Sequence, residues 1–375
     1  MSNSRMYFLD NLRSFIIMLM VVFHGALAYM VYAPEWWYVV DHQKNLFFDL
    51  FVVFADNFIM PIMFFISGYF GIKSLVKRTA SDFWNDKFKV IIAPWIFGSM
   101  LIAPIIAFLT PASRYVPISF TEFYKTLFWG PYYQHAHYWY LGFLVLLYVL
   151  LVIAHKINPK IGEVSPNTNA PSFLFFLMIG LLGGLGYWAV NLVYADGVWL
   201  HPLWLVVFQP TRVPLYLIYF AVGVYAHYKQ WFSIGYSPSM KIWLPLFILF
   251  GLAHLTNVFI VPTLGLSPEN YKVIRALLHS FFCLSAIFGL ISLFKAKFNL
   301  TNNFWYSLSI SSYAIYYLHQ LPILCSNWLV RPLEINVFLK YIIAMAIGVT
   351  FTYLVSRYLL IKIPCFGNTK KKLIQ

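Results

Sequence analysis

Long apolar segments, separated by short polar connections, run along almost the whole chain. Each is roughly 20 residues long, the length that an α-helix needs to cross about 30 Å of hydrocarbon. Read in order, they predict about ten membrane spans, at residues 12–33, 47–72, 88–109, 138–155, 172–194, 204–227, 243–263, 273–294, 305–329 and 337–361. Because no polar stretch is long enough to fold as a separate soluble domain, we expect an all-α, polytopic membrane helix bundle that forms a single domain over residues 1–375.

The span expected at residues 204–227 has the least defined start. Pro210, Arg212 and Pro214 interrupt it, and a proline inside a helix removes a backbone hydrogen bond and crowds the preceding turn. Two starts therefore fit the pattern, one at residue 204 and one after the prolines. An odd total number of spans stays open.

The composition supports a membrane protein. Hydrophobic residues make up 61% of the chain and charged residues only 10%, and the mean hydropathy is +0.72, values far outside the range of soluble domains. The cysteines Cys283, Cys325 and Cys365 are scattered and predict neither a disulfide framework nor a metal site. His135 and His137 have the spacing of a ligand pair, but they lack a nearby acidic or cysteine partner in the sequence, so we expect no metal there.

The basic residues predict how the bundle is oriented. If the N-terminus is cytoplasmic, most of the 26 lysines and arginines fall on that side, in agreement with the positive-inside rule. This distribution predicts an even number of spans with both termini cytoplasmic, and it explains the net charge of +14. Membrane lipids are the partners that such a chain implies, whereas nucleic acid would need a soluble basic face that the pattern does not provide.

The N-terminal segment has a competing interpretation as a cleaved signal peptide. Arg5 precedes an apolar stretch, and the small residues at 26 and 28 fit a cleavage site. Asp10 and Arg13 crowd the start of the stretch, however, and apolar residues continue to Tyr32. We therefore favour a retained membrane helix.

Two ionisable residues in this first segment are candidates for chemistry. Arg13 and His24 are eleven residues apart, so at 100° per residue they return to within about 20° of one helix face, about 16 Å apart along the axis. Ionisable side chains inside a membrane are costly and usually functional. An imidazole, whose unperturbed pKa is near 6.5, can accept a proton from a hydroxyl at physiological pH, which makes His24, at an expected mid-membrane depth, a candidate general base. The alternative is a histidine that is only hydrogen-bonded inside the bundle.

Four sequence segments, in this order, carry a resemblance to a known family. They are FLDNLRSFIIMLMVVFH in the first span, FADNFIMPIMFFISGYF in the second, HYWYLGFLVLLY at the start of the fourth and SYAIYYLHQLPIL in the ninth. Together they resemble the acyltransferase 3 family of integral membrane acyltransferases, in particular its glucan-modifying branch, the glucans biosynthesis protein C group. The arginine and histidine with ten residues between them are the family's most specific mark.

The resemblance implies a multi-pass enzyme of the bacterial inner membrane. It would transfer an acyl group, acetyl or succinyl, from cytoplasmic acyl-CoA to a hydroxyl of an envelope carbohydrate, such as a periplasmic glucan or an exopolysaccharide. Acyl-CoA would be the donor substrate, and no permanently bound cofactor is implied. The sequence leaves open the acyl group, the acceptor, the oligomeric state and whether a partner protein completes the transfer.

The resemblance also assigns roles to individual residues. His24 matches the family's essential histidine. Arg13 matches its arginine, which we expect to help seat coenzyme A, with a topological anchor as the alternative. Lys87 and Lys89 stand where the family usually carries an arginine pair before the third span. Lysine supplies charge but not a bidentate fork, so their expected binding of the donor's phosphates is less specific.

Further candidates lie in later spans. Ser312, Tyr316 and His319 recur at helical spacing in the ninth span, where His319 could orient His24, bind the acceptor or bond a neighbouring helix. We take His24 and His319 as the catalytic candidates. The candidates for substrate contact are Ser67, Tyr69, Trp139, Tyr316 and Arg212, the last as a partner for an anionic acyl group such as succinyl. Ser67 lacks the glycine spacing and the strand of a nucleophile elbow, which favours a structural or substrate-contact role.

A secondary transporter or a flippase for an envelope saccharide is the competing class, because about ten spans and intramembrane histidines also occur there. The sequence shows no internal repeat, and the acidic residues that usually couple ions are nearly absent from the spans, with Asp49 and Asp56 as the candidates. Consumption of a thioester that depends on a carbohydrate acceptor would separate the enzyme from both alternatives.

Overall fold

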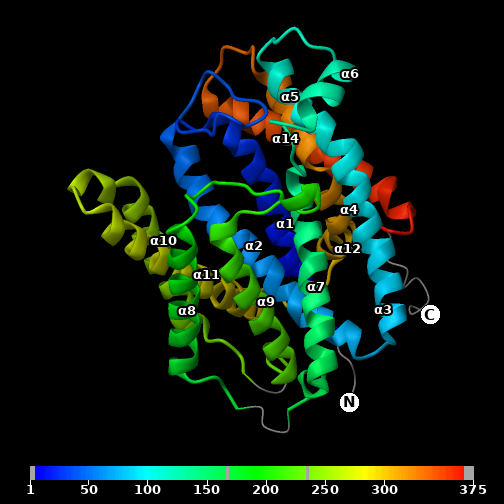
Figure 1. The fold of residues 1–375 in the computed structure, drawn as a ribbon, viewed down its shortest axis with the longest axis vertical. Helices are drawn as coiled ribbons and strands as arrows, with labels where there is room; N and C mark the ends of the chain where they lie inside the picture. Colours follow the sequence, from blue (N-terminus) through cyan, green and yellow to red (C-terminus); the bar gives the residue numbers. More distant parts are fainter. Residues whose placement is uncertain (1–4, 166–168, 234–235, 367–375) are drawn as a thin grey trace.

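The helices of the protein pack side by side into one bundle (Figure 1). The computed structural model describes residues 5–165, 169–233 and 236–366. In this part of the chain, ten helical segments run through the bundle: α1 (Tyr7–Ala26), α2 (Leu46–Leu75), the continuous run of α3 (Ala80–Lys87), α4 (Ala93–Phe97) and α5 (Ala103–Ser113), α7 (Trp139–Ile157), α8 (Phe173–Asn191), α9 (Val213–Tyr228), α10 (Met240–Phe259), α11 (Pro268–Lys297), α12 (Asn303–Leu318) with α13 (Gln320–Val330), and α14 (Val337–Tyr358). The short helix α6 (Phe120–Phe123) lies in a connection. The prediction of an all-α, polytopic membrane bundle is confirmed.

Eight of these segments, counted within the described residues, are long and apolar enough to cross a membrane. The two other predicted spans are shorter for identifiable reasons. The sixth begins only at Val213, because the prolines confine the preceding residues to a separate 3₁₀ turn (Pro210–Arg212), and α9 is left with 16 residues. The ninth is divided into α12 and α13 at His319.

The third segment contains two π-helical turns, Phe88–Ile92 and Gly98–Ile102. Each is followed directly by an alanine and a proline, with the prolines at positions 94 and 104. Proline has no N–H to donate and its ring crowds the carbonyl one turn earlier, so the helix widens locally and then continues. The helix starts at Ala80, well before the expected start at residue 88.

Helices α2 and α9 touch at the level of their backbones. A Cβ atom added to Gly68 would lie 2.1 Å from the carbonyl oxygen of Phe220, and one added to Gly223 would lie 2.1 Å from that of Phe65. Such close approach between small residues is a main source of helix association in membranes, where burial from water contributes little. The contact fixes the relative position of two helices that both contribute to a cavity at one end of the bundle.

The helix connections gather at two ends of the bundle. The first end, where α1 begins, carries the connections α2–α3, α7–α8, α9–α10 and α11–α12. The second end, where α1 ends, carries the connections α1–α2, α5–α7, α8–α9, α10–α11 and α13–α14. Any residue can therefore be assigned to one end from its position along its helix.

Candidate active site

A cavity of about 860 Å³ lies at the second end of the bundle. Four of the residues that the sequence predicts as catalytic or substrate-contact candidates line it: His24 of α1, Trp139 of α7, Arg212 before α9 and Tyr316 of α12. The fold thus brings together candidates that are far apart in the chain. A concave, mostly apolar site with a few polar groups is the usual form of a small-molecule binding site.

His24 lies in the last turn of α1, close to the second end, rather than at the middle depth that we expected from the apolar segment. The difference arises because α1 ends at Ala26 and the chain continues through a 3₁₀ turn into the connection at 30–45. Its Nδ1 lies 2.8 Å from the carbonyl oxygen of Met20, and its ring stacks on Trp37 with 5.9 Å between the centroids. A ligand in the cavity can therefore reach the imidazole.

Pro322 explains the break between α12 and α13. Proline cannot donate a hydrogen bond to the carbonyl four residues earlier, and its ring crowds that carbonyl. Side chains bond two carbonyls beside the break: His319 Nδ1 lies 2.7 Å from the Tyr316 oxygen, and the Tyr138 hydroxyl donates to the Tyr317 oxygen at 2.8 Å. The break therefore fixes the orientation of the His319 ring.

Hydrogen bonds determine which nitrogen of each histidine carries the proton. The Tyr316 carbonyl can only accept, so His319 Nδ1 is the donor and Nε2 of the neutral ring holds the lone pair. His319 Nε2 lies 3.2 Å from His24 Nδ1, which also faces the Met20 carbonyl. Between two acceptors, His24 Nδ1 must carry its proton. The unprotonated Nε2 of neutral His24 bonds to none of the described residues and is available to a ligand.

His137 and Gln320 belong to the same cluster, and sequence reasoning did not select them. The His137 ring lies 4.6 Å from the His319 ring. Its Nδ1 is 2.7 Å from Gln320 Oε1 and its Nε2 is 3.0 Å from the Tyr317 carbonyl oxygen. The available signal was adjacency, because His137 begins the HYWYLG segment and Gln320 follows His319.

Arg212 and Asp56 form an ion pair in the cavity wall. Arg212 Nη2 bonds to a carboxylate oxygen of Asp56, and Nη1 lies 3.4 Å from the Asp56 backbone oxygen. The side chains are 19% and 36% exposed. Asp56 on α2 thus holds the turn that precedes α9.

Trp139 contributes an aromatic face to the same cavity. Its ring stacks on Tyr216 with 5.8 Å between the centroids and an interplanar angle of 28°, and it meets the edge of Trp199 at 5.6 Å. Tyr216 and Trp199 also line the cavity. Flat aromatic faces of this kind suit the apolar faces of a ring-shaped ligand.

The connection at 30–45, which carries Trp37, is anchored on three sides. The Asp49 carboxylate accepts the backbone N–H groups of residues 31 and 32 at 2.8 and 2.9 Å. Arg114 donates to the backbone carbonyls of residues 35 and 37 at 2.8 and 3.0 Å. Asp41 pairs with Lys340 of α14 at 3.2 Å, and both side chains are buried. These bonds hold Trp37 against His24.

His135 takes part in a separate chain of hydrogen bonds at the second end. The Trp95 Nε1 atom donates to His135 Nδ1 at 3.3 Å, His135 Nε2 lies 2.8 Å from the Tyr133 hydroxyl, and that hydroxyl donates to the Trp204 carbonyl. A second ring proton would have to lie on Nδ1, where it would point at the Trp95 N–H, so the contacts disfavour the charged ring. Burial, with a smaller effect of His201, lowers the pKa of His135 to about 4.

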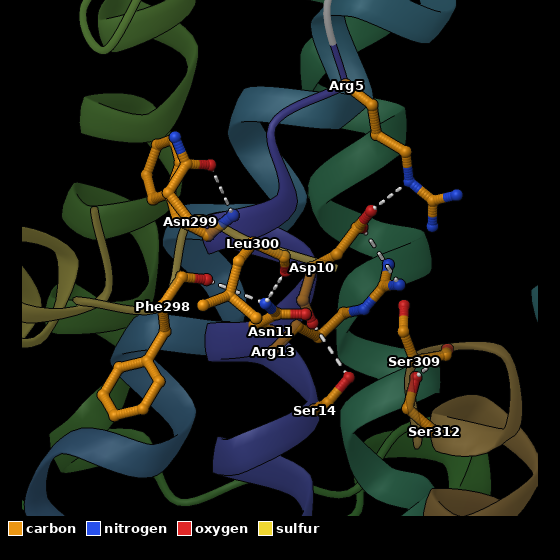
Figure 2. Close-up of polar contacts among 11 residues, drawn as sticks. Arg5, Asp10, Asn11, Arg13, Ser14, Phe298, Asn299, Leu300, Ser309 and Ser312 are labelled. Carbon is orange, nitrogen blue, oxygen red and sulfur yellow. Dashed lines mark hydrogen bonds and ion pairs between the residues drawn. The ribbon is translucent and has the colours of Figure 1, made fainter. Parts of the chain in front are cut away.

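Arg13 lies near the opposite end of α1, away from the cavity. Figure 2 shows its guanidinium between Asp10, on the same helix, and the serines Ser309 and Ser312 of α12. Asp10 lies 3.5 Å from Arg13 and is also bonded to Arg5 at 2.7 Å. The Arg13 side chain is 36% exposed, so it is accessible from the first end.

Ser67 and Tyr69 lie on α2 outside the residues that line the cavity. Ser67 Oγ is 2.8 Å from the Tyr140 hydroxyl, and the buried Tyr69 donates its hydroxyl to the Met6 sulfur at 3.6 Å. Both residues are thus placed between the cavity and the first end.

Lys87 and Lys89 lie in the third helical segment, near the first end. Lys87 Nζ is 3.5 Å from Asp86 and 5.1 Å from the ring centroids of both Phe83 and Tyr148. Lys89, in the first π-helical turn, is exposed. Both cations are therefore on the side of Arg13 and not on the side of the cavity.

Comparison with known proteins identifies the family. The family model described as Acyltransferase domain (Acyl_transf_3) matches residues 6–357. The chain belongs to the acyltransferase 3 family. The glucans biosynthesis protein C of Escherichia coli (strain SMS-3-5 / SECEC) is 29% identical over 189 residues, which cover 49% of this chain and 48% of that protein. The protein of the same name from Escherichia coli O139:H28 is 27% identical over 267 residues, which cover 68% of this chain and 66% of that protein.

The first of these alignments spans about half the length of the curated relative. No solved structure matches this acyltransferase 3 protein. Family membership and eight apolar helices together place it among multi-pass proteins of the bacterial inner membrane. The matched region contains Arg13, His24 and His319, so the family's domain includes the whole candidate site.

Proposed function

We propose that this protein is an O-acyltransferase that moves an acyl group from acyl-CoA to a hydroxyl of an envelope carbohydrate. The donor binds at the first end, which faces the cytoplasm, and the acceptor enters the cavity at the second end. Family membership supports acyl transfer, and the name of the relatives supports a glucan as the acceptor class.

One observation carries the proposal: His24 lines the cavity while its Nδ1 lies within hydrogen-bonding distance of two acceptors, an arrangement that leaves Nε2 of the neutral ring as the basic nitrogen. In the reaction, the acceptor's hydroxyl gives its proton to His24 Nε2 and its oxygen bonds to the thioester carbonyl carbon. The carbon–sulfur bond breaks, and the departing thiolate of coenzyme A takes the proton from His24. The Met20 carbonyl and His319 Nε2 accept from Nδ1 throughout and stabilise the imidazolium that forms in between.

Basic groups at the first end support the proposal that the donor binds there. Arg13, Lys87 and Lys89 lie on that side, and guanidinium and ammonium groups bind the phosphates of coenzyme A. Arg13 and His24 are separated by about 16 Å of α1, a distance that the donor's flexible arm would bridge. The same charge pattern supports cytoplasmic termini.

The residues that line the cavity support the proposal of a carbohydrate acceptor. Trp139, Tyr216 and Trp37 provide aromatic faces, and Asp56 and Gln320 provide hydrogen-bonding groups. Sugars combine apolar ring faces with hydroxyl groups, so they need both kinds of wall.

The test is release of free coenzyme A thiol by the purified protein, with and without a glucan acceptor, together with the mass of the glucan. We expect thiol release that depends on the acceptor and a glucan that gains the acyl mass. Movement of glucan across a proteoliposome without any thiol release would contradict the proposal and support the transporter or flippase alternative.

A further inference from the structure

We infer that a second pocket, separate from the cavity at His24, binds the anionic headgroup of a membrane phospholipid. The pocket lies at the second end of the bundle, has a volume of about 340 Å³, and is lined in part by Lys44, Arg114 and Arg331. None of the residues that line it also lines the cavity. The inference stands apart from the proposed function, because it requires neither acyl transfer nor a particular acceptor.

No carboxylate pairs with the three cations of this pocket in the part of the chain that the structure describes. Elsewhere at the second end, Arg212, Arg275 and Lys340 each form an ion pair with an aspartate. The pocket cations take part in none of the ion pairs among the described residues. A hollow lined by uncompensated positive charge attracts and concentrates anions.

Arg114 is fixed in the wall by backbone carbonyls. Its Nη1 donates to the Thr110 oxygen at 2.9 Å, and its Nη2 donates to the oxygens of Glu35 and Trp37 at 2.8 and 3.0 Å. Carbonyl oxygens accept hydrogen bonds but carry no net charge, so the positive charge of the guanidinium remains. Arg114 therefore contributes a fixed positive charge to the pocket and leaves direct bonds to its neighbours.

Arg331 and Lys44 keep hydrogen-bond donors for a ligand. Arg331 Nη1 donates to the Ser113 carbonyl oxygen at 2.5 Å, and the other N–H groups of this guanidinium have no partner among the described residues, including the buried Nε. The Lys44 side chain is exposed, and its ammonium group bonds to no residue that the structure describes. Guanidinium and ammonium groups together are typical partners of a phosphate.

The aspartate in the lining, Asp41, is neutralised from behind the pocket. It pairs with Lys340 at 3.2 Å, and the two side chains are 2% and 0% exposed. Asp41 Oδ1 also accepts the backbone N–H of Gln43 at 2.8 Å. The buried pair therefore adds no net charge to the pocket, and the three cations determine its sign.

The position of the pocket corresponds to the depth of lipid headgroups. Lys44 lies just before α2, and Arg331 lies in the connection just before α14. Both helices are long and apolar enough to cross a membrane. The Asp41–Lys340 bond joins the two connections, which lie at the same end of the bundle (Figure 1). Residues next to the ends of membrane spans are at the interface, where phospholipid phosphates are found.

Exposed apolar side chains follow the pocket residues in both helices. They are Leu46 and Phe47 of α2 and Phe338 and Leu339 of α14. The rings of Phe47 and Phe338 lie 5.6 Å apart, so the two apolar surfaces meet. A phospholipid has the same order of groups, a phosphate followed by apolar chains, whereas free phosphate would use only the charged part. This order favours a lipid as the occupant.

The experiment titrates the purified, delipidated full chain in detergent with phosphatidylglycerol or with phosphatidylcholine that carries the same acyl chains, and native mass spectrometry counts the bound lipid. We expect phosphatidylglycerol to bind about tenfold more tightly, because its headgroup is a net anion. Equal binding of the two lipids would overturn the inference. Inorganic phosphate at a concentration matched to the lipid should not displace it, and displacement would assign the pocket to free phosphate instead.

Variants separate this pocket from the basic residues at the first end. Lys44→Gln with Arg331→Gln should weaken phosphatidylglycerol binding about 30-fold, since each basic group near an anionic headgroup contributes about fivefold in affinity. Lys125→Gln with Lys272→Gln removes the same charge from the same end, outside the pocket, and should leave binding unchanged. Equal losses in both double variants would overturn the inference. If the first double variant does not fold, Lys44→Gln alone decides, with an expected loss of about fivefold; unchanged binding would contradict the assignment.

Discussion

His319 Nε2 lies 3.2 Å from His24 Nδ1, and this one contact joins the break between α12 and α13 to the last turn of α1. The Tyr316 carbonyl fixes the proton on His319 Nδ1, and that in turn fixes the proton on His24 Nδ1. The tautomer of His24, which lines the cavity, thus depends on a residue that does not itself line the cavity.

His319, a catalytic candidate from the sequence, is expected to act by positioning His24, so its substitution should affect turnover more than binding. We expect His319→Ala to lower kcat about 100-fold, the usual cost of a misplaced reacting group, with little change in KM for the donor. His319→Gln can still accept from His24 through its amide oxygen and should retain more activity than His319→Ala. Steady-state kinetics of the two variants check this, and equal loss in both would argue against the hydrogen-bond role.

Pro322 should matter for activity although it lies outside the cavity. Pro322→Ala restores a backbone N–H and allows α12 and α13 to join, which should leave stability equal or higher because proline costs about 3 kcal/mol inside a helix. The restored N–H would bond the Leu318 carbonyl, and in the rejoined helix the Gln320 N–H would bond the Tyr316 carbonyl and compete with His319 Nδ1. We expect kcat to fall about tenfold and the amides of residues 319–323 to exchange more slowly. Unchanged kcat in a straightened helix would contradict this account of the break.

The buried pair Asp41–Lys340 should dominate the stability of the second end. Removal of one partner leaves an uncompensated buried charge, so Lys340→Met should destabilise the protein by about 3–5 kcal/mol. The double variant with Asp41→Asn should recover much of that loss, because the remaining charge is removed. Thermal unfolding in detergent of the single and double variants provides the measurement. Additive losses would indicate that the two residues act independently.

His135 should make the second end sensitive to acid. Its folded-state pKa of about 4 lies below the ordinary value of 6.5, so the unfolded chain binds the proton more readily, and stability is lost as the pH falls from about 6.5 towards 4. At pH 5 the loss from this residue should be about 2 kcal/mol relative to pH 7.5.

His135→Gln removes the titrating group and is the control for this effect. We expect its unfolding temperature to change less between pH 7.5 and pH 5 than that of the wild-type protein. A parallel change in both proteins would assign the acid sensitivity to other groups.

The positions of the helices could be predicted because apolar length alone decides where a chain crosses a membrane. The division at His319 and the π-helical turns before Pro94 and Pro104 were not predicted, since the apolar pattern runs through them without interruption. The late start of α9 was left open by the sequence, and the prolines at 210 and 214 decided it.

Two kinds of signal selected the candidates that lie at the second end: an ionisable group in an apolar segment, and, for Trp139 and Tyr316, a position in a segment that resembles the family. His24 and His319 are ionisable groups in apolar segments and therefore attracted attention from the sequence. The contribution of Gln320 depends on its contact with His137, 183 residues away in the chain, and periodicity within one helix carries no information on such contacts. The pairing of Arg212 with Asp56 across 156 residues was unpredictable for the same reason.

The central claim is that His24 takes the acceptor's proton. The most direct measurement is acceptor-dependent thiol release by purified His24→Ala, alongside His42→Ala, which removes an exposed histidine from the same end of the bundle. We predict that kcat falls by a factor of about 10² to 10⁴ in His24→Ala while the variant still binds acyl-CoA. His42→Ala should keep wild-type turnover. Wild-type thiol release by a folded His24→Ala protein would contradict the account.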